Sequence, residues 1–440
     1  MALFEINECN YLWKNKNILN YSKIIWYTID MKKDLIKREK YLERIRPFYD
    51  LDVIKVMVGS RRAGKSKIIE LIIDELIEKG IKKSNIISIN FENVDFDEID
   101  DYKKLNDYVK KRIKNENRYY LFFDEIHHVD HFEKAINSFR ATLNCSVFIT
   151  GSNSKMLSSD ISSLLTGRTI TFEINPFSFD EAKMYLDLKQ KKIDNLFANY
   201  LMLGGYPLRF DLDDEELVKQ YLNELFESIL NKDIFTRNVE IEKEKFTKVA
   251  KYILINAGNE FNAKNIMDYL NKENGKNYIS IQTIYNYIEK MKKCYLIREV
   301  NRYYIPGKEI LTSNAKYYAI DNGFRIINTN SGEYSPSRFL ENVICNELIS
   351  RGYEVYIGKT YKGEVDFVAM KNSKKCFIQV SYIMESEETI EREFGAFSPI
   401  KDASPKYVFS LDRIDLSRNG ITHINIEDYL LHRIDVVLSW

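Results

Sequence analysis

The chain has 440 residues, enough for about three domains of typical size, so a motif in one part need not describe the rest. With 45% hydrophobic and 30% charged residues, its composition is that of a folded protein and excludes extensive disorder. Lysine and arginine (65 residues) balance aspartate and glutamate (65 residues), which removes any argument from net charge toward a nucleic acid or a membrane surface.

The spacing of the cysteines and the lack of long apolar runs indicate the cellular compartment of the protein. The cysteines are scattered and never spaced as a CxxC pair, so neither a disulfide framework nor a zinc site is indicated; they are Cys9, Cys145, Cys294, Cys345 and Cys376. No apolar run approaches the roughly 20 residues that span a bilayer, and residues 1–30 lack the features of a signal peptide. These observations predict a cytoplasmic protein without membrane association.

The N-terminal segment, residues 1–30, precedes a second methionine, Met31, after which a charged pattern of helical period begins at once. We hypothesise that Met31 is the natural start and that residues 1–30 are an upstream extension; loss of soluble expression on their deletion would contradict this. The spacing predicts an amphipathic helix over 31–48, ended by Pro47.

Short apolar runs rich in β-branched and aromatic residues alternate with helix-length segments in the first part of the chain. Because strands that alternate with helices form parallel sheets covered on both faces, this pattern predicts an α/β fold. The four runs are 53–58, 85–90, 119–124 and 146–151, and a fifth strand is predicted at 170–179, with a turn at Pro176.

The remainder of the chain divides into three patterns. Past Asp180 the sequence is helical by period, except for a glycine-glycine-proline corner at 203–207. Helical stretches and then an alternating β-ribbon follow, in the order of a winged helix; the helices are predicted at 243–256, 262–272 and 280–293. The last part predicts a separate α/β unit, with a helix at 338–351 and strands at 353–357, 364–370, 376–382 and 406–411.

Residues 59–66, GSRRAGKS, fit the phosphate-loop pattern G-x-x-x-x-G-K-[ST] between a predicted strand and a predicted helix. The glycines let backbone N–H groups turn toward phosphate oxygens, and the helix N-terminus adds partial positive charge. Lys65 would reach the β and γ phosphates of ATP, and Ser66 would ligate Mg²⁺. The predicted nucleotide-binding residues are Gly59, Ser60, Arg61, Arg62, Ala63, Gly64, Lys65 and Ser66.

An acidic pair follows the third predicted strand. Asp124 falls at the carboxyl end of this strand, where ligands collect in parallel α/β sheets. Asp124 would hold Mg²⁺ and Glu125 would polarise the attacking water, so the pair predicts ATP hydrolysis. His127 and His128 come next, but without a third ligand at metal spacing we interpret them as surface or packing residues.

Three further polar residues are candidates for phosphate contacts. Ser152 and Asn153 follow the fourth strand, where a side chain would sense the γ-phosphate; short polar residues also cap helices and fill turns. Arg168 would contact a phosphate in its own or a neighbouring subunit, as arginine fingers do, or else pair with an acid on the surface. The sequence leaves these alternatives open.

Together these motifs resemble the AAA-type ATPases related to archaeal and bacterial members on the NACHT-like side of the superfamily. The resemblance rests on GSRRAGKS (59–66), FFDEIHHV (122–129), the segment 148–168 and LGGYP (203–207), and extends from about Met31 to the C-terminus. It implies nucleotide and hydrolysis roles for Lys65, Ser66, Asp124 and Glu125. It also implies a C-terminal domain of unknown function that contains a winged helix and a restriction-endonuclease-like unit.

The predicted organisation therefore has five parts. They are a possible N-terminal extension (1–30), an AAA-type P-loop ATPase core (31–180), a helical lid segment (181–240), a winged-helix domain (241–312) and an endonuclease-like α/β domain (313–440).

Endonuclease-like folds gather an acid on the first helix, an acid on a strand and an E/Q-x-K triad on the next strand around Mg²⁺. Glu341 falls on the predicted helix, Asp366 with Glu364 on one strand, and Gln379 at the start of the triad. Ser381 stands where the lysine is expected, and loss of that cation impairs the stabilisation of developing charge. We interpret these residues as a degenerate nuclease site used for binding or assembly, with an active nuclease as the alternative.

The predicted winged helix carries groups that would contact DNA phosphates and base edges. They are Gln282, Thr283, Asn286, Lys290, Lys293, Arg298, Arg302 and Lys308, interleaved with Tyr285, Tyr287, Tyr303 and Tyr304. Domain packing is the alternative use of this surface.

The motifs together predict three candidate functions for the chain. They are an ATP-hydrolysing switch whose C-terminal half engages DNA or a protein partner, an ATP-gated nuclease of a defence or mobile-element system, and a regulatory scaffold with slow ATPase activity. The sequence leaves oligomer formation open.

Overall fold

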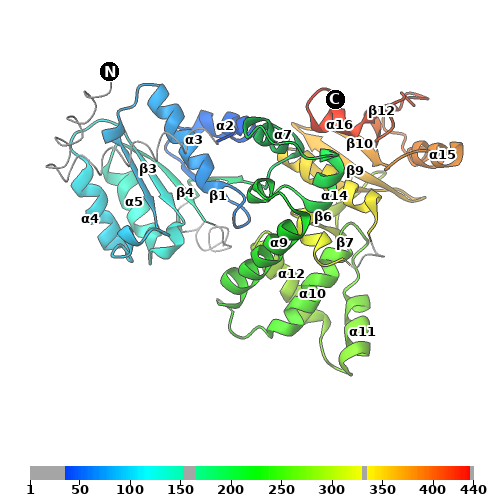
Figure 1. Cartoon of the computed structure of the whole chain (residues 1–440), viewed down its shortest axis with the longest axis horizontal. Helices are drawn as coiled ribbons and strands as arrows, with labels where there is room; N and C mark the ends of the chain where they lie inside the picture. The colour runs from blue at the N-terminus through cyan, green and yellow to red at the C-terminus, as the bar shows by residue number, and fades with distance from the viewer. Residues whose placement is uncertain (1–34, 152–163, 166, 237, 330–333, 437–440) are drawn as a thin grey trace, which may run out of the picture.

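The computed structural model describes residues 35–151, 164–165, 167–236, 238–329 and 334–436. Two β-sheets with their covering helices lie toward opposite ends of the long axis of the molecule, and a group of helices from the middle of the chain lies beside the second sheet (Figure 1). In the part of the chain that the structure describes, no helix is long and apolar enough to cross a membrane.

The first sheet has five strands in the order β2-β3-β4-β1-β5, all paired in parallel. The strands are β1 (Ile54–Val58), β2 (Ile86–Asn90), β3 (Tyr119–Asp124), β4 (Cys145–Thr150) and β5 (Thr169–Glu173). Every residue of β1, β3 and β4 is buried, as expected of parallel strands that are covered on both faces. The structure therefore confirms the predicted parallel α/β sheet.

Apolar clusters fill both faces of this sheet. Helices α4 (Tyr102–Arg112) and α5 (Phe132–Thr142) cover one face, and α2 (Glu39–Ile45) and α3 (Lys65–Glu78) cover the other. The helix predicted over 31–48 is too long: α2 begins only at Glu39, and the backbone at Arg38 is not helical.

The buried side chain of Arg38 explains this late helix start. Its guanidinium forms an ion pair with Glu181 at 2.8 Å and donates a hydrogen bond to the carbonyl oxygen of Ala63 at 3.0 Å. Buried charges are stable only when they are paired and hydrogen-bonded. These contacts fix the Arg38 side chain at the residue just before α2, where the backbone is not helical.

The middle of the chain is helical, as the sequence predicts. Its helices are α7 (Phe179–Leu188), α8 (Leu196–Leu203), α9 (Glu215–Ile229), α10 (Lys243–Ile255), α11 (Ala263–Asn274) and α12 (Ile281–Lys293), with a π-helical turn at Leu230–Phe235. A hairpin of β6 (Ile297–Tyr304) and β7 (Glu309–Ala319) follows α12, in the predicted order of three helices and a ribbon.

The second sheet has seven strands in the order β12-β11-β10-β9-β8-β6-β7. Its later strands are β8 (Glu354–Lys359), β9 (Glu364–Lys371), β10 (Lys374–Val380), β11 (Lys406–Ser410) and β12 (Thr422–Asn425), with helices α13 (Asn322–Ile326), α14 (Pro336–Ser350), α15 (Glu387–Gly395) and α16 (Ile426–Leu430). Because β6 pairs in parallel with β8, the hairpin belongs to this sheet. The boundary predicted between residues 312 and 313 falls inside β7.

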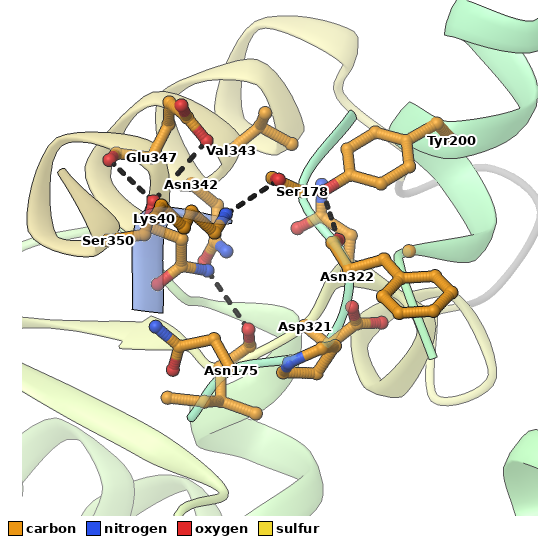
Figure 2. A pocket seen from close by; sticks show the side chains of 15 residues that line it. Lys40, Asn175, Ser178, Tyr200, Asp321, Asn322, Asn342, Val343, Glu347 and Ser350 are labelled. Atoms are coloured by element: carbon orange, nitrogen blue, oxygen red, sulfur yellow. Dashed lines mark hydrogen bonds between the residues drawn. The ribbon is translucent and has the colours of Figure 1, made fainter. Parts of the chain in front are cut away.

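A buried aspartate joins the glycine corner at 203–207 to the second sheet. The carboxylate of Asp321 accepts hydrogen bonds from the backbone N–H groups of Gly205 at 2.7 Å and Gly323 at 2.8 Å. A Cβ on Gly204 would lie 1.7 Å from Asp321 Oδ1, so only glycine fits there. Figure 2 shows the small polar cavity, about 40 Å³, beside this joint, where Lys40 bonds to Ser178 close to α14.

Stability of this joint is expected to depend on pH. Burial raises the pKa of Asp321 from 3.8 to about 6. Between about pH 4 and 6 the folded chain then binds more protons than the unfolded chain, so the stabilisation from Asp321 is complete below about pH 4 and is lost as the pH rises through 6. The loss has an upper bound of about 3 kcal/mol.

The Asp321→Asn chain is expected to lack this part of the pH dependence. Urea unfolding of both chains at several pH values between about 4 and 7 measures the difference in their free energies of unfolding. A difference that stays constant across this range would contradict the assignment.

Candidate functional site

The predicted phosphate loop, residues 59–66, runs from the carboxyl end of β1 to the N-terminus of α3. Gly59 and Gly64 have φ angles of 141° and 98°, which favour glycine. A Cβ on Gly59 would lie 2.1 Å from the carbonyl oxygen of Ile174, so the loop passes too close to the end of β5 for any larger residue. The amine of Lys65 is buried and donates to the carbonyl oxygens of Gly59 and Ser60, at 3.1 Å each. The loop therefore curls around its own lysine.

The ends of β3 and β4 bring three oxygen-bearing side chains together beside the loop. The carboxylate of Asp124 accepts hydrogen bonds from the hydroxyls of Thr150 and Ser66. Burial raises the pKa of Asp124, and these two hydrogen bonds oppose the shift. The Thr150 oxygen also accepts a hydrogen bond from the backbone N–H of Glu125 at 2.9 Å. Thr150, which the sequence analysis does not single out, thus fixes both acids.

The donor set fits Mg²⁺. Ser66 and Asp124 offer a hydroxyl and a carboxylate oxygen, and Mg²⁺ in nucleotide sites takes one or two carboxylates together with substrate phosphates. Within the described ranges, no three histidine, cysteine or acidic side chains are grouped so that they would hold a metal ion by themselves. A metal at this point would therefore depend on phosphate oxygens for its remaining ligands.

Glu125 lies between a lysine and a histidine. Its carboxylate oxygens are 3.8 Å from Lys65 Nζ and 3.2 Å from His127 Nδ1. Its φ of 51° is unusual outside glycine, and such strain persists where the surroundings enforce it, often at functional sites. Burial lowers the pKa of Lys65, and the carboxylates of Glu125 and Asp124 oppose this. His127 is therefore a site residue that the sequence analysis does not anticipate.

Three consecutive loop residues contact the helices that follow β5, and we call these three pairs the clasp. Ser60 shares a hydrogen bond with the hydroxyl of Tyr206 at 2.7 Å. Arg61 donates two hydrogen bonds to Asp233, at 3.1 and 3.2 Å, and the Arg62 guanidinium lies near the hydroxyl of Tyr221. Asp233 belongs to the π-helical turn, a rare conformation that often marks functional sites.

A cavity of about 790 Å³ extends from the loop along the clasp. Its lining combines charged and polar side chains, among them Arg61, Lys65, Ser66 and Glu125, with apolar ones, which are Leu35, Ile36, Leu71, Pro207 and Leu208. The volume lies within the range of about 300–1,000 Å³ that is usual for small-molecule sites. The charged side chains suit phosphates, and the apolar ones suit a planar base.

The remaining predicted phosphate contacts have different outcomes. Ser152 and Asn153 lie outside the described residues, so their sensor role stays a prediction. Arg168 is exposed and precedes β5, whose first residue pairs with Ile54 at the start of β1. It therefore lies at the opposite end of β1 from the loop, and a five-residue strand spans roughly 16 Å. The prediction that Arg168 reaches a phosphate of its own chain is wrong, whereas contact with a neighbouring chain stays a prediction.

The residues predicted at the C-terminal site, three acids of α14 and β9 and the amide Gln379 of β10, lie close together. The backbone N–H of Asp366 donates to Gln379 Oε1 at 3.2 Å. Burial and the neighbouring Glu341 carboxylate raise the pKa of Asp366. Lys316 of β7 lies between two of the acids, with its Nζ 3.6 Å from oxygens of both Glu341 and Glu364. A lysine from the hairpin thus stands at the site where the sequence analysis finds none.

Two arginines predicted to contact DNA are engaged within the chain. Arg298 donates to Glu173 and to Asn175 Oδ1, at the end of the first sheet. Arg302 is buried and pairs with Glu364. Both predictions are wrong, because Arg298 joins the second sheet to the end of the first and Arg302 is buried in an ion pair within the second sheet. On α12 the exposed polar residues are Gln282, Asn286, Glu289 and Lys293.

The chain is similar in sequence to two known domain families and to two relatives. Residues 52–183 match the AAA domain, and residues 194–332 match a domain of unknown function (DUF8612). An uncharacterized protein of Haemophilus influenzae is 32% identical over 408 residues, which cover 91% of this chain and 100% of the relative. An uncharacterized protein of Methanocaldococcus jannaschii is 33% identical over 407 residues, 88% of this chain and 87% of the relative.

Solved structures are more distant. The ORC2 protein of Aeropyrum pernix, in ADPNP and ADP complexes, has a TM-score of 0.39 and 10% identity, and the match covers 70% of this chain and 90% of that protein. AMPPCP-bound DnaA of Aquifex aeolicus has a TM-score of 0.30 and 14% identity, and the match covers 59% of this chain and 89% of that protein. Similarity at this level is too weak to bear on function.

Proposed function

The chain belongs to the family of AAA-domain proteins that includes these Haemophilus influenzae and Methanocaldococcus jannaschii relatives, and from this membership we propose that it is a Mg²⁺-dependent ATPase. In this proposal the clasp passes the nucleotide state to the C-terminal half. The observation that carries it is the meeting of Lys65, the Ser66–Asp124 pair and Glu125 at one end of the first sheet. A loop that only binds nucleotide does not need the two acids.

Each residue has a separate task in hydrolysis. Lys65 would turn from the loop carbonyls to the β and γ phosphates of ATP. Mg²⁺ held by Ser66 and Asp124 would neutralise charge on those phosphates. Glu125 would orient and polarise the water that attacks the γ-phosphorus, while the leaving oxygen departs with ADP. His127 would fix the orientation of the Glu125 carboxylate from its position at 3.2 Å.

The clasp supports the proposed switch. Phosphates that enter the loop meet Arg61, which is paired with Asp233, and Arg62, which lies near Tyr221. Any movement of these arginines toward phosphate must change the Arg61–Asp233 ion pair and the proximity of Arg62 to Tyr221. Tyr206 extends the connection, because the neighbouring Gly205 donates a hydrogen bond to Asp321, which follows β7 of the second sheet and caps α13. The partner of the C-terminal half would be DNA or a protein, and the chain would act alone or as an oligomer.

Phosphate release from ATP tests the proposed activity. The purified chain is expected to release phosphate in the presence of Mg²⁺, and EDTA is expected to stop it. Addition of single- and double-stranded DNA in parallel reactions tests whether DNA stimulates turnover. A chain that binds ATP but releases no phosphate at any Mg²⁺ concentration would contradict the assignment as an ATPase.

An ATP-gated nuclease is a second candidate function, favoured by the position of Lys316. This lysine would stabilise charge on the phosphate, which is the task of the lysine that Ser381 replaces. Glu341, Asp366 and Gln379 would supply oxygen ligands for a divalent ion, and water would attack phosphorus while the sugar oxygen leaves.

The nuclease candidate predicts that DNA cutting depends on the metal, on Asp366 and on Lys316. Plasmid and single-stranded DNA are incubated with the chain, ATP and Mn²⁺ or Mg²⁺, and products are separated on gels. Loss of cutting in both Asp366→Ala and Lys316→Ala would support a nuclease. No cutting of any DNA form, or cutting that survives in Asp366→Ala, would rule it out.

A further inference from the structure

A groove of about 950 Å³ lies at the turn of the β6–β7 hairpin, and none of the phosphate-loop residues lines it. Four separate segments form its walls: the hairpin turn at 305–308, Tyr361 after β8, the β9–β10 turn at 373–375 and the loop at 399–404 before β11. We call it the basic groove. All four segments belong to the second sheet or its connections, so the groove depends on the sheet that includes the hairpin.

The charge of this groove differs from that of the whole chain. Of the described residues that line it, four are lysines and one is acidic; they are Lys308, Lys374, Lys375, Lys401 and Asp402. Lys375 pairs with Asp402 at 2.6 Å, and the side chains of Lys308 and Lys401 lie at exposed positions. In a chain of zero net charge, this is a local excess of positive charge within a hollow. A polyanion is the ligand that such a surface attracts.

Aromatic side chains accompany the lysines. Tyr361 is 65% exposed, which is unusual for a large ring, and it lies on the wall of the groove. The Lys375 amine lies 5.6 Å from the centre of the Tyr303 ring, which forms part of the same wall. Lysines that follow a phosphate backbone together with rings on which bases stack are the combination that binds single-stranded nucleic acid.

We propose that the basic groove binds single-stranded nucleic acid, with Lys308 and Lys401 on phosphates and a base stacked on Tyr361. Duplex recognition places a helix or ribbon into the major groove, whereas this surface is a hollow between four loops that a flexible strand enters. Of the groups that the sequence predicts to contact DNA, the inference keeps Lys308 and Tyr303 of the hairpin and leaves out those of α12. It does not depend on ATP hydrolysis, because no residue of the phosphate loop takes part.

Fluorescence anisotropy of the full chain with a labelled oligothymidylate of about 20 nucleotides tests the proposal. The chain is expected to bind this strand more tightly than a duplex of equal length. With phosphate contacts from Lys308 and Lys401, affinity is expected to fall about sevenfold between about 50 and 200 mM salt. Absence of binding at the lower salt concentration, or equal or tighter binding of the duplex, would overturn the proposal.

Matched variants locate the contact. The Lys308→Ala/Lys401→Ala chain is expected to bind about tenfold more weakly and to lower the salt slope by about 1.4. Tyr361→Ala is expected to weaken binding at least about fivefold, whereas Tyr361→Phe keeps the ring and the affinity. Lys82→Ala/Lys83→Ala, at exposed positions of the first domain, is the control and is expected to bind normally. Normal binding by both groove variants, or loss instead in Asn286→Ala/Lys293→Ala on α12, would overturn the proposal.

Discussion

Replacing Lys65 by alanine is expected to weaken ATP binding at least about 100-fold. The amine of Lys65 is buried within the loop, from where it would donate charge-assisted hydrogen bonds to bound phosphate, and loss of two such bonds removes about 3 kcal/mol or more. Isothermal titration calorimetry with ATP and Mg²⁺ measures the dissociation constant. Lys79→Ala, at an exposed position just beyond α3, is the control and is expected to bind ATP normally.

The Lys65→Ala chain is expected to stay folded. Burial already disfavours the charged form of this lysine, as its lowered pKa indicates, so removal of the amine leaves an apolar group in place of a costly charge. Thermal unfolding checks this. An unchanged dissociation constant in a folded Lys65→Ala chain would show that the phosphate loop is not the ATP site.

Replacing Glu125 by glutamine is expected to leave ATP binding intact and to lower turnover at least about 100-fold. Glutamine has the shape of glutamate and lies within the same contacts, but it does not accept a proton from the attacking water, and such catalysis contributes 10²–10⁴-fold. Steady-state phosphate release and ATP binding on the same preparation separate the two effects.

Glu92→Gln is the matched control for this variant. Glu92 is an exposed acid that lines the same cavity and lies 3.6 Å from Arg61, and its carboxylate makes no hydrogen bond with Ser66 or Asp124 among the described residues. Turnover of the Glu92→Gln chain is expected to stay within about threefold of that of the unchanged chain, because an exposed ion pair contributes little free energy. Near-normal turnover in the Glu125→Gln chain would show that a residue other than Glu125 activates the water.

The local sequence pattern is sufficient to predict the phosphate loop, the position of Asp124 at a strand end and the five parallel strands. The loop motif is contiguous in sequence, and strands alternating with helices determine a sheet whose carboxyl ends collect ligands. The sequence does not distinguish Thr150 as a site residue, because threonine is common at strand ends. Only the three-dimensional pairing of β3 with β4 brings its hydroxyl to Asp124.

The residues that the sequence did not reveal are joined by contacts between distant segments. Arg61 and Asp233 are 172 positions apart, and Arg38 and Glu181 are 143 apart, so no local period connects them. Lys316 is a further example: it reaches Glu364 because β6 pairs with β8, although β7, α13 and α14 lie between these strands in the sequence. Single-sequence pattern does not specify pairing between strands so far apart.

Hydrogen–deuterium exchange of the Glu125→Gln chain, with and without ATP and Mg²⁺, tests the central claim that the clasp passes nucleotide state from the loop to the helices beyond it. The account predicts slower exchange both at residues 59–66 and at residues 206–235, which contain Tyr206, Tyr221 and Asp233. The Lys65→Ala chain is expected to show neither change. Slower exchange at the loop alone would contradict the claim.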